Sequence, residues 1–313
     1  MKVSICCITY DHGPYIRRAI EGFLSQRTDF PFEIIIHDDA SKDGTAAIVK
    51  EYADHDPRIR AILRETNIKS TGVPVFPILY GMARGKYIAL CEGDDHWTDP
   101  LKLQQQVDAL EADPQAVGCF TDAWNERDGM RTSYMDGIYA HPPVSRTVEQ
   151  REMVMGQNIP TCTFLFRREH LLPLPEAMYK APVGDTVLYT HLTRNGHLLY
   201  LPIHTSVRTM HAGGIHSLKT KLFKLEVQWK LLPILDGMTE GRYTADVQRK
   251  ITHVALASWA EAVEAGDRHA MRRWWKNVRG RRDAGWNRTT TWRNWMKGHV
   301  PHLERLYAML RGA

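Results

Sequence analysis

The first 110 residues alternate between short apolar runs and longer stretches whose apolar residues recur at helical spacing. Apolar runs with few polar positions are typical of strands that are buried on both faces of a parallel sheet. The amphipathic stretches predict helices that pack on such a sheet through right-handed βαβ units. We therefore expect an α/β fold with a mostly parallel, doubly wound sheet. Its expected strands are residues 3–8, 32–36, 59–63 and 87–91.

The last of these runs, residues 87–91, leads directly into the acidic sequence Glu-Gly-Asp-Asp at positions 92–95. In open α/β sheets, the carboxyl ends of the strands border the crevice that binds ligands. Adjacent carboxylates repel each other, and a divalent metal often holds them together because hard cations prefer oxygen ligands. The alternative is a solvated acidic turn that caps the helix beginning near Asp99.

Two other strand ends carry polar side chains. Thr9 and Tyr10 follow the first expected strand, and Asp38 and Asp39 follow the second. Parallel strands place their carboxyl ends at one edge of the sheet, so these groups should line the same edge as residues 92–95. The sequence therefore predicts one polar site built from three strand ends.

Three segments of the chain resemble family 2 glycosyltransferases of the GT-A fold. They are VSICCITYDHGPYIRRAIEGFLSQ, EIIIHDDASKDGT and GKYIALCEGDDHWTDPLKLQQQV, and they occur in the family's order and spacing within the first 110 residues. Any one of them alone is a weak signal, whereas the ordered set is specific. Members of this family transfer a sugar from a nucleotide-sugar donor, usually with a divalent metal and with inversion at the anomeric carbon.

The resemblance implies donor-binding roles for the first two strand ends. Ile8, Thr9 and Tyr10 would flank the nucleotide base. Asp39 would accept a hydrogen bond from the base, because a buried carboxylate that faces a ring N–H is a specific reader. The alternative role of Asp39 is that of a turn residue before Ser41.

The resemblance also implies a divalent metal, Mn²⁺ or Mg²⁺, that holds the donor diphosphate. Asp94 and Asp95 would contact the ribose and the metal–diphosphate group, and their division of labour stays open because family members differ in the register of this motif. Glu92 stands where many members have Asp and could share this work. His211, beside paired glycines in the position of the family's flexible loop, is a further candidate ligand, with His216 as the alternative. A purely structural role for such a histidine is equally open.

A further segment, residues 182–196, predicts a helix that opens with Gly184 and Asp185. A carboxylate in the first turn of a helix is electrostatically favoured, so simple capping is one interpretation of Asp185. In the resembled family, an Asp at the start of such a helix is the catalytic base that takes the proton of the acceptor hydroxyl. Asp185 is the only acidic residue between Glu176 and Glu226, so this region offers no competing base.

The pattern changes twice in the rest of the chain. Residues 122–150 are rich in polar residues, Gly and Pro, and predict a long loop on the acceptor side. From residue 218 onward the apolar spacing is helical. We therefore expect a catalytic domain at 1–217, with a donor half at 1–97 and an acceptor half at 98–217, and a helical C-terminal region at 218–313. Shorter expected elements are a helix at 101–110 and strands at 116–121, 161–167 and 198–201.

The basic character of the chain belongs to its tail. Residues 268–313 contain 12 Lys or Arg against 2 Asp or Glu, a net charge of +10, whereas the whole chain carries only +5. Five of the nine Trp lie in the same segment, interleaved with the basic residues. Such a pattern suits an anionic membrane surface or nucleic acid, of which nucleic acid is the less favoured. It equally suits a helical region whose Trp side chains pack inward.

No apolar run reaches the length of a membrane-spanning helix, and the start of the chain lacks the pattern of a secretory signal. The five cysteines have no zinc-like spacing and lie in or beside apolar runs, which is typical of buried thiols in a reducing compartment. We therefore expect a cytoplasmic protein, and one interpretation of the basic tail adds peripheral contact with the inner face of the membrane.

These observations favour an inverting, metal-dependent glycosyltransferase that uses a nucleotide sugar, UDP-linked, to build a bacterial-type surface polysaccharide on a glycan or lipid-linked acceptor. A sugar nucleotidyltransferase is one alternative, but residues 11–14 do not supply the basic, Gly-rich phosphate loop that it would need. A glycan-binding protein on an inactive transferase scaffold is another. The presence of Asp39, Asp94, Asp95 and Asp185 argues against it.

Overall fold

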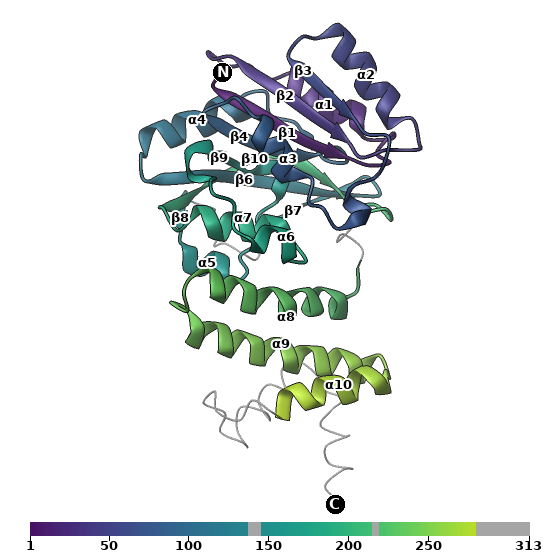
Figure 1. The fold of residues 1–313 in the computed structure, drawn as a ribbon, viewed down its shortest axis with the longest axis vertical. Coiled ribbons are helices and arrows are strands. Elements are labelled where there is room, and N and C mark those ends of the chain that lie inside the picture. The colour runs from purple at the N-terminus through teal and green to yellow at the C-terminus, as the bar shows by residue number, and fades with distance from the viewer. Residues whose placement is uncertain (137–144, 215–218, 280–313) are drawn as a thin grey trace, which may run out of the picture.

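The computed structural model describes residues 1–136, 145–214 and 219–279. Its first half is a parallel sheet with the strand order β3-β2-β1-β4 (Figure 1). These strands lie within two residues of the predicted bounds, since β1, β2 and β4 are apolar runs that are buried on both faces. The strands are β1 (Val3–Thr9), β2 (Phe32–Asp38), β3 (Ile59–Leu63) and β4 (Tyr87–Glu92).

Neighbouring residues along these strands point into two separate apolar cores, one on each face of the sheet. Helices α1 and α4 cover one face, and α3 and α7 cover the other, so the sheet is a buried central layer as the apolar runs predict. The helices of the α/β part are α1 (Ile16–Leu24), α2 (Thr45–His55), α3 (Phe76–Met82), α4 (Lys102–Ala112), α5 (Gln150–Val154), α6 (Ala177–Lys180) and α7 (Gly184–Leu192).

The second half of the sheet contradicts the prediction of a long loop over residues 122–150. β6 continues to Arg127 and pairs with β7, and residues 146–148 form β8 because they add to the edge of β10. The complete order is β3-β2-β1-β4-β9-β6-β10-β5, in which the short β9 is antiparallel to both of its neighbours. These strands are β5 (His96–Trp97), β6 (Ala116–Arg127), β7 (Met130–Ser133), β8 (Arg146–Val148), β9 (Leu165–Arg167) and β10 (His197–Thr209).

Two further predicted strands differ from the structure. Residues 161–163 form a 3₁₀ turn, and only residues 165–167 of the predicted strand 161–167 pair with the sheet. The predicted strand 198–201 is instead the first part of the long β10, which continues past Pro202. A register shift between Leu201 and His204 absorbs the proline, which has no N–H for the ladder.

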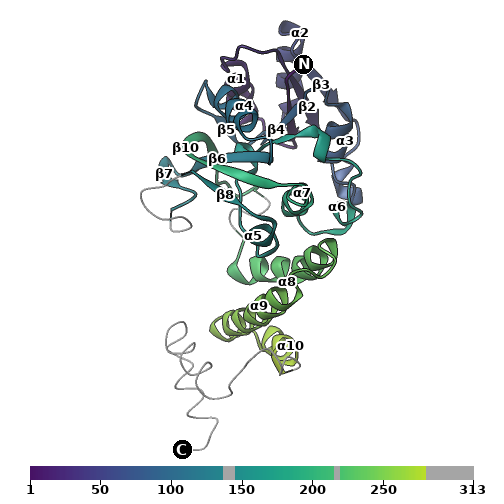
Figure 2. The same ribbon diagram turned by 90° about the vertical axis from the view of Figure 1, so that its left-hand side faces the viewer.

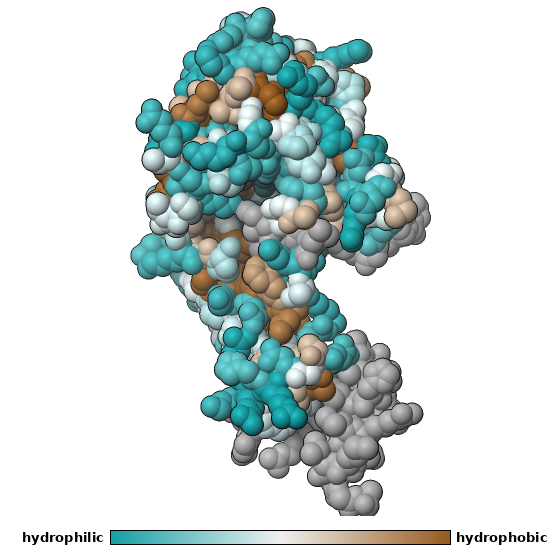
Figure 3. All heavy atoms as spheres, turned by 90° about the vertical axis from the view of Figure 1, so that its right-hand side faces the viewer, coloured by the Kyte–Doolittle hydropathy of each residue, from teal (hydrophilic) through white to brown (hydrophobic). Residues whose placement is uncertain are grey.

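The C-terminal region contains three described helices that stack away from the sheet (Figures 1 and 2). α8 packs against α5 and α7, α9 packs against α8, and α10 packs against α9. Apolar side chains form a band on the surface at the level of α8 (Figure 3), where Phe223 is 37% exposed. The helices are α8 (Lys221–Met238), α9 (Thr244–Glu264) and α10 (Arg268–Arg279). The domain boundary at residue 217 stays a prediction.

Two of the five tail Trp residues lie in the described part of the chain. Trp274 is 2% exposed and its ring meets that of Trp229 edge to face at 5.1 Å, whereas Trp275 is 40% exposed beside Trp259. Inward packing therefore accounts for Trp274. The other three, Trp286, Trp292 and Trp295, lie outside the described residues. Within residues 1–136, 145–214 and 219–279, no helix combines the length and the apolar character needed to span a bilayer.

Candidate functional site

The loop after β1 is fixed to the loop after β2 by hydrogen bonds that begin at its backbone amides. The N–H of His12 donates to Oγ1 of Thr45 at 2.9 Å, and the N–H of Gly13 donates to Oδ2 of Asp43 at 2.7 Å. In return, Oδ1 of Asp11 accepts from the backbone N–H of the second loop at Lys42, at 2.6 Å. These bonds fix the backbone that carries the His12 side chain.

Gly93 allows the turn after β4 to lie directly against the end of β1. Its N–H donates to the carbonyl of Ile8 at 2.8 Å. A Cβ at this position would lie only 2.7 Å from Cβ and Oγ1 of Thr9, so any larger residue would push the turn away. The close approach brings the next residue, Asp94, beside the loop that carries His12.

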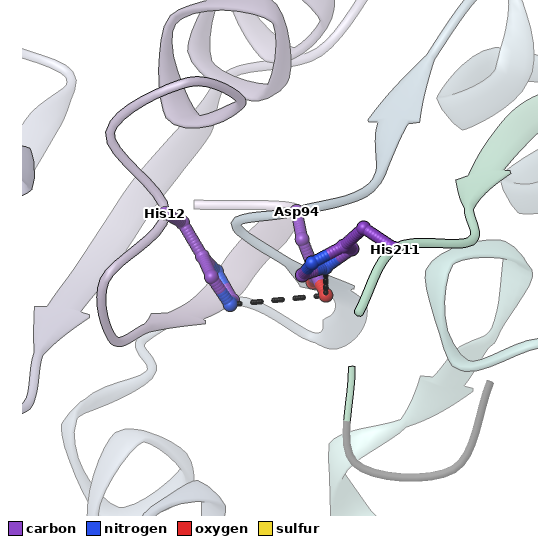
Figure 4. Close-up of side chains that lie close together, drawn as sticks. All are labelled: His12, Asp94 and His211. Atoms are coloured by element: carbon purple, nitrogen blue, oxygen red, sulfur yellow. Dashed lines mark hydrogen bonds and ion pairs between the residues drawn. The ribbon is translucent and has the colours of Figure 1, made fainter. Parts of the chain in front are cut away.

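Asp94 lies between two histidines, His12 in the loop after β1 and His211 just after β10 (Figure 4). Its Oδ2 is 3.0 Å from Nε2 of His211 and 3.7 Å from Nε2 of His12. One candidate ligand atom from each of the three residues fits within a mutual separation of 4.8 Å. Each side chain is less than a fifth exposed, and the ring of Tyr15 packs against that of His211 at 4.6 Å. One carboxylate and two imidazoles form a donor set for a divalent cation.

His12 was not among the candidates that the sequence indicates. The available signal was its position, three residues beyond the end of β1 on the edge that the strand ends share. Burial lowers the pKa of His12, against the opposing effect of Asp94, and so favours the neutral ring that can bind a metal. His216, the alternative to His211, lies outside the described residues.

Asp95 has a different environment from its neighbour Asp94. Its Oδ1 accepts a hydrogen bond from the backbone N–H of Thr209 at 2.9 Å, and the side chain is buried. Burial, and then the charge of Asp94, raise the pKa of Asp95 to about 7. The bond ties the turn after β4 to the end of β10, two residues before His211. A direct role of Asp95 as a metal ligand stays a prediction.

Two further carboxylates were candidates from the sequence: Glu92, the last residue of β4, and Asp185, in the first turn of α7. Among the described residues, Oε2 of Glu92 is buried without a hydrogen-bond partner. Burial, and then the charges of Asp95 and Asp94, raise the pKa of Glu92 well above its usual range, and Asp185 adds to the effect. Asp185 lies in the first turn of α7, where its Oδ1 accepts from the N–H of Thr186 at 2.5 Å. The charge of Asp185 thus adds to the raised pKa of Glu92, and its role as the catalytic base stays a prediction.

The predicted base-binding residues lie at the adjoining strand ends. Both carboxylate oxygens of Asp39 accept backbone hydrogen bonds, from Ile68 at 2.9 Å and from Lys69 at 3.0 Å, so Asp39 organises that segment. Tyr10 is 43% exposed and available to a ligand, whereas Thr9 is buried with no partner for its Oγ1 within the described residues. Contact with a nucleotide base stays a prediction for these residues and for Ile8.

Trp97, which follows the acidic turn, has a packing role. Its side chain is 3% exposed, its Nε1–H donates to the carbonyl of Cys162 at 2.7 Å, and its ring meets that of Phe23 at 4.8 Å.

His211 borders an open hollow of about 430 Å³. The hollow is also lined by residues of β10, the β6–β7 turn and the loop before α1, among them Thr209, Met210, Glu126, Asp128 and Tyr15.

The fold is shared with two solved glycosyltransferase structures of low sequence identity. TarS of S. aureus (residues 1–349), in complex with UDP-GlcNAc, superposes with a TM-score of 0.58 at 17% identity over 90% of this chain and 92% of that one. The mannosyltransferase PcManGT from Pyrobaculum calidifontis, in complex with GDP-Man and Mn²⁺, gives 0.55 at 18% identity over 88% and 79%. These similarities establish the GT-A fold.

The sequence comparison is more specific. An uncharacterized protein of Mycobacterium tuberculosis is 40% identical over 226 residues, which make up 70% of this chain and 62% of that protein. The match thus covers less than two thirds of the relative's own length. Residues 4–172, more than half of the chain, match the family described as glycosyl transferase family 2. The chain therefore belongs to glycosyl transferase family 2.

Proposed function

We propose that this chain is an inverting, metal-dependent glycosyltransferase that moves a sugar from a nucleotide sugar to a hydroxyl of a glycan or lipid-linked acceptor. The observation that carries the proposal is the cluster of Asp94, His12 and His211 at the carboxyl ends of three strands in a family 2 fold. The UDP-GlcNAc complex of TarS supports a UDP-linked donor. The GDP-Man complex of PcManGT makes a GDP-linked donor the alternative.

In the proposed reaction, the acceptor oxygen attacks the anomeric carbon while the bond from that carbon to the diphosphate breaks on the opposite face. Asp185 accepts the proton of the hydroxyl. Asp185 lies in the first turn of α7, where the helix dipole favours a negative charge. Asp94 and His211 would hold the divalent cation, which would neutralise the charge of the departing diphosphate as a Lewis acid.

The donor base would lie along the neighbouring strand ends. The exposed ring of Tyr10 offers a stacking surface for a base, and such stacking is tolerant of base identity. Selectivity would come from polar groups at this edge. The candidates are the carboxylate of Asp39 and the Oγ1 of Thr9, which has no partner among the described residues. In this proposal Ile8, Thr9, Tyr10 and Asp39 bind the nucleoside, and Asp94 reaches the diphosphate side.

Replacing Asp185 with Asn tests the proposal. The amide keeps the size of the side chain but cannot accept the acceptor's proton, so turnover should fall by about 10²–10⁴-fold. Turnover is measured as release of the nucleoside diphosphate from UDP-GlcNAc and from GDP-mannose, with water or a lipid-linked glycan as acceptor. Glu176→Gln is the matched control, because Glu176 is a 79% exposed carboxylate paired only with Lys180 among described residues, and it should retain full turnover.

Donor affinity, measured by calorimetry on the same variants, separates the possible outcomes. In Asp185→Asn it should stay within about twofold of the wild-type value, because the donor contacts lie on other elements. Wild-type turnover in this variant would remove Asp185 from the mechanism. A loss of donor binding together with turnover would show that Asp185 holds the donor and that the base lies elsewhere.

We also infer that the basic tail brings the protein to an anionic membrane surface, where a lipid-linked acceptor would lie. The support is that α10 carries no Asp or Glu and exposes Arg268, Arg272 and Lys276. Sedimentation of the full chain with vesicles of anionic phospholipid should decrease as salt rises, because surface attraction is screened. Failure to sediment at low salt would leave inward packing as the role of the tail Trp residues.

A further inference from the structure

The metal candidates contain more nitrogen than a site designed for Mg²⁺ requires. Two of the three ligand-type side chains, His12 and His211, are imidazoles, and only Asp94 offers oxygen. Carboxylate, carbonyl and water oxygens suit Mg²⁺, whereas imidazole suits first-row transition metals and zinc. The donor set therefore favours a first-row transition metal or zinc over Mg²⁺.

The spacing of the three side chains fits coordination of one metal ion, and the pair of Asp94 and His211 also lies at hydrogen-bond distance. Ligands about 2.1 Å from one metal ion are separated by roughly 3.0–3.5 Å when they are neighbours in its coordination shell. Oδ2 of Asp94 is 3.0 Å from Nε2 of His211 and 3.7 Å from Nε2 of His12. The longer separation exceeds a hydrogen bond but lies within a small side-chain adjustment of a shared cation.

The ring of His12 has no hydrogen bond to either nitrogen among the described residues. Its Nδ1 is buried without a partner, and its Nε2 points toward Asp94 (Figure 4). Nε2, the atom that faces Asp94, is the one that would bind a cation, and it carries no hydrogen bond among the described residues. The backbone on both sides of the ring is nevertheless fixed, through Thr45 and Asp43. An imidazole on a fixed backbone, with its Nε2 facing a carboxylate, is a preorganised ligand.

We propose that His12 is a metal ligand together with Asp94 and His211, and that this donor set makes the site select Mn²⁺, Co²⁺ or Zn²⁺ over Mg²⁺. The inference rests on the proposed function, because the cation is the one that would hold the donor diphosphate. Affinity should rise from Mn²⁺ to Co²⁺, following the order of stability for nitrogen-containing sites. The ring of Tyr15, 4.6 Å from that of His211, supports the orientation of the second imidazole.

Metal titration of the full chain without nucleotide tests the selection directly. Calorimetry should show Mn²⁺ binding at least tenfold tighter than Mg²⁺, and Co²⁺ tighter than Mn²⁺. His12→Gln should weaken Mn²⁺ binding by about 10–100-fold and change Mg²⁺ binding little. His211→Gln is the second variant and should behave in the same way. His55→Gln is the matched control, since His55 is an exposed histidine on α2, and it should bind every metal as the wild type does.

Pulsed electron paramagnetic resonance of the Mn²⁺-loaded chain identifies the ligands themselves. The wild-type spectrum should show coupling to two imidazole nitrogens, and each single histidine variant should show coupling to one. Equal affinity for Mg²⁺ and Mn²⁺, or unchanged nitrogen coupling in His12→Gln, would overturn the inference. Sugar transfer that depends on Asp185 but persists with wild-type efficiency in Mg²⁺ would overturn the inference alone and leave the proposed function standing.

Discussion

The two ends of the central strands hold buried carboxylates in opposite electrostatic environments. At the amino end, Glu33 of β2 is 1% exposed and accepts hydrogen bonds from Ser4 at 2.7 Å, from Arg84 at 2.6 Å and from Arg60 at 3.1 Å. At the carboxyl end, Glu92 has a buried oxygen with no partner within the described residues. After burial, the charges of Asp95 and Asp94 contribute most to its raised pKa.

The pKa shifts of the two groups have opposite signs. Burial alone would raise the pKa of Glu33, but the hydrogen bonds from Arg84, Ser4 and Arg60 lower it to about 2. Burial raises the pKa of Glu92 well above its usual range, and its acidic neighbours add to the rise. A buried carboxylate that has its own cations is a structural group. A cluster that lacks them is relieved either by taking up protons or by binding a cation.

The largest effect is expected from Glu33→Gln. The amide places a donor against the guanidinium groups of Arg84 and Arg60, so the free energy of unfolding should fall by about 3 kcal/mol. Urea denaturation measures it. The control is Glu51→Gln, which removes an exposed pair with Arg17 and should cost less than about 1 kcal/mol. A loss below 1 kcal/mol in Glu33→Gln would show that this end of the sheet does not depend on its ion pairs.

Acid should weaken the same contact in a defined pH window. The folded-state pKa of Glu33, about 2, lies below the ordinary value of 4.5, so its stabilising effect is complete above pH 4.5 and disappears as the pH falls toward 2. The difference in unfolding free energy between the wild type and Glu33→Gln should shrink by roughly 2 kcal/mol between pH 5 and pH 3. Urea titrations at both pH values measure it, and a constant difference would contradict the assigned cause.

A smaller effect of opposite sign is expected from Glu92→Gln. Replacing this carboxylate with a neutral amide removes repulsion from Asp94 and Asp95, so the metal-free protein should become more stable by about 1 kcal/mol. Thermal unfolding in the presence of a chelator measures the change. A destabilised variant would mean that a positive or hydrogen-bonding group stabilises the carboxylate of Glu92. Glu92 and Glu33 would then have similar environments, which would contradict the comparison.

The apolar runs were sufficient to predict β1 to β4, because strands that are buried on both faces show in the sequence itself. They could not predict the outer half of β6, whose residues 124–127 are partly exposed and carry polar side chains where they pair with β7. The predicted end of the strand 198–201 was wrong for a related reason. A proline usually ends a strand, and the register shift that accommodates Pro202 depends on the partner strand β6.

The sequence pattern predicted those parts of the site that directly follow a buried strand. Acidic residues that directly follow a buried strand can be placed on the ligand-binding edge from the sequence, as Asp94 shows. The sequence does not reveal that the adjacent Asp95 turns back to bind the backbone of Thr209, because that contact joins segments far apart in the chain. His12 was missed because a histidine in a loop has no periodicity to mark it, and only the folded turn at Gly93 brings it to Asp94.

The hydrogen bond between Asp95 and Thr209 joins two segments that are synthesised at different times, so the site is completed late in synthesis. His12 and Asp94 leave the ribosome early, whereas His211 lies just beyond β10, the last strand in the described part of the chain. Because sheet pairings between distant segments form slowly, the edge stays incomplete until β10 has paired with β6 and Asp95 can hold its end. A nascent or truncated chain that stops before residue 209 therefore lacks both the hydrogen bond to Asp95 and the imidazole of His211, even when its first four strands are folded.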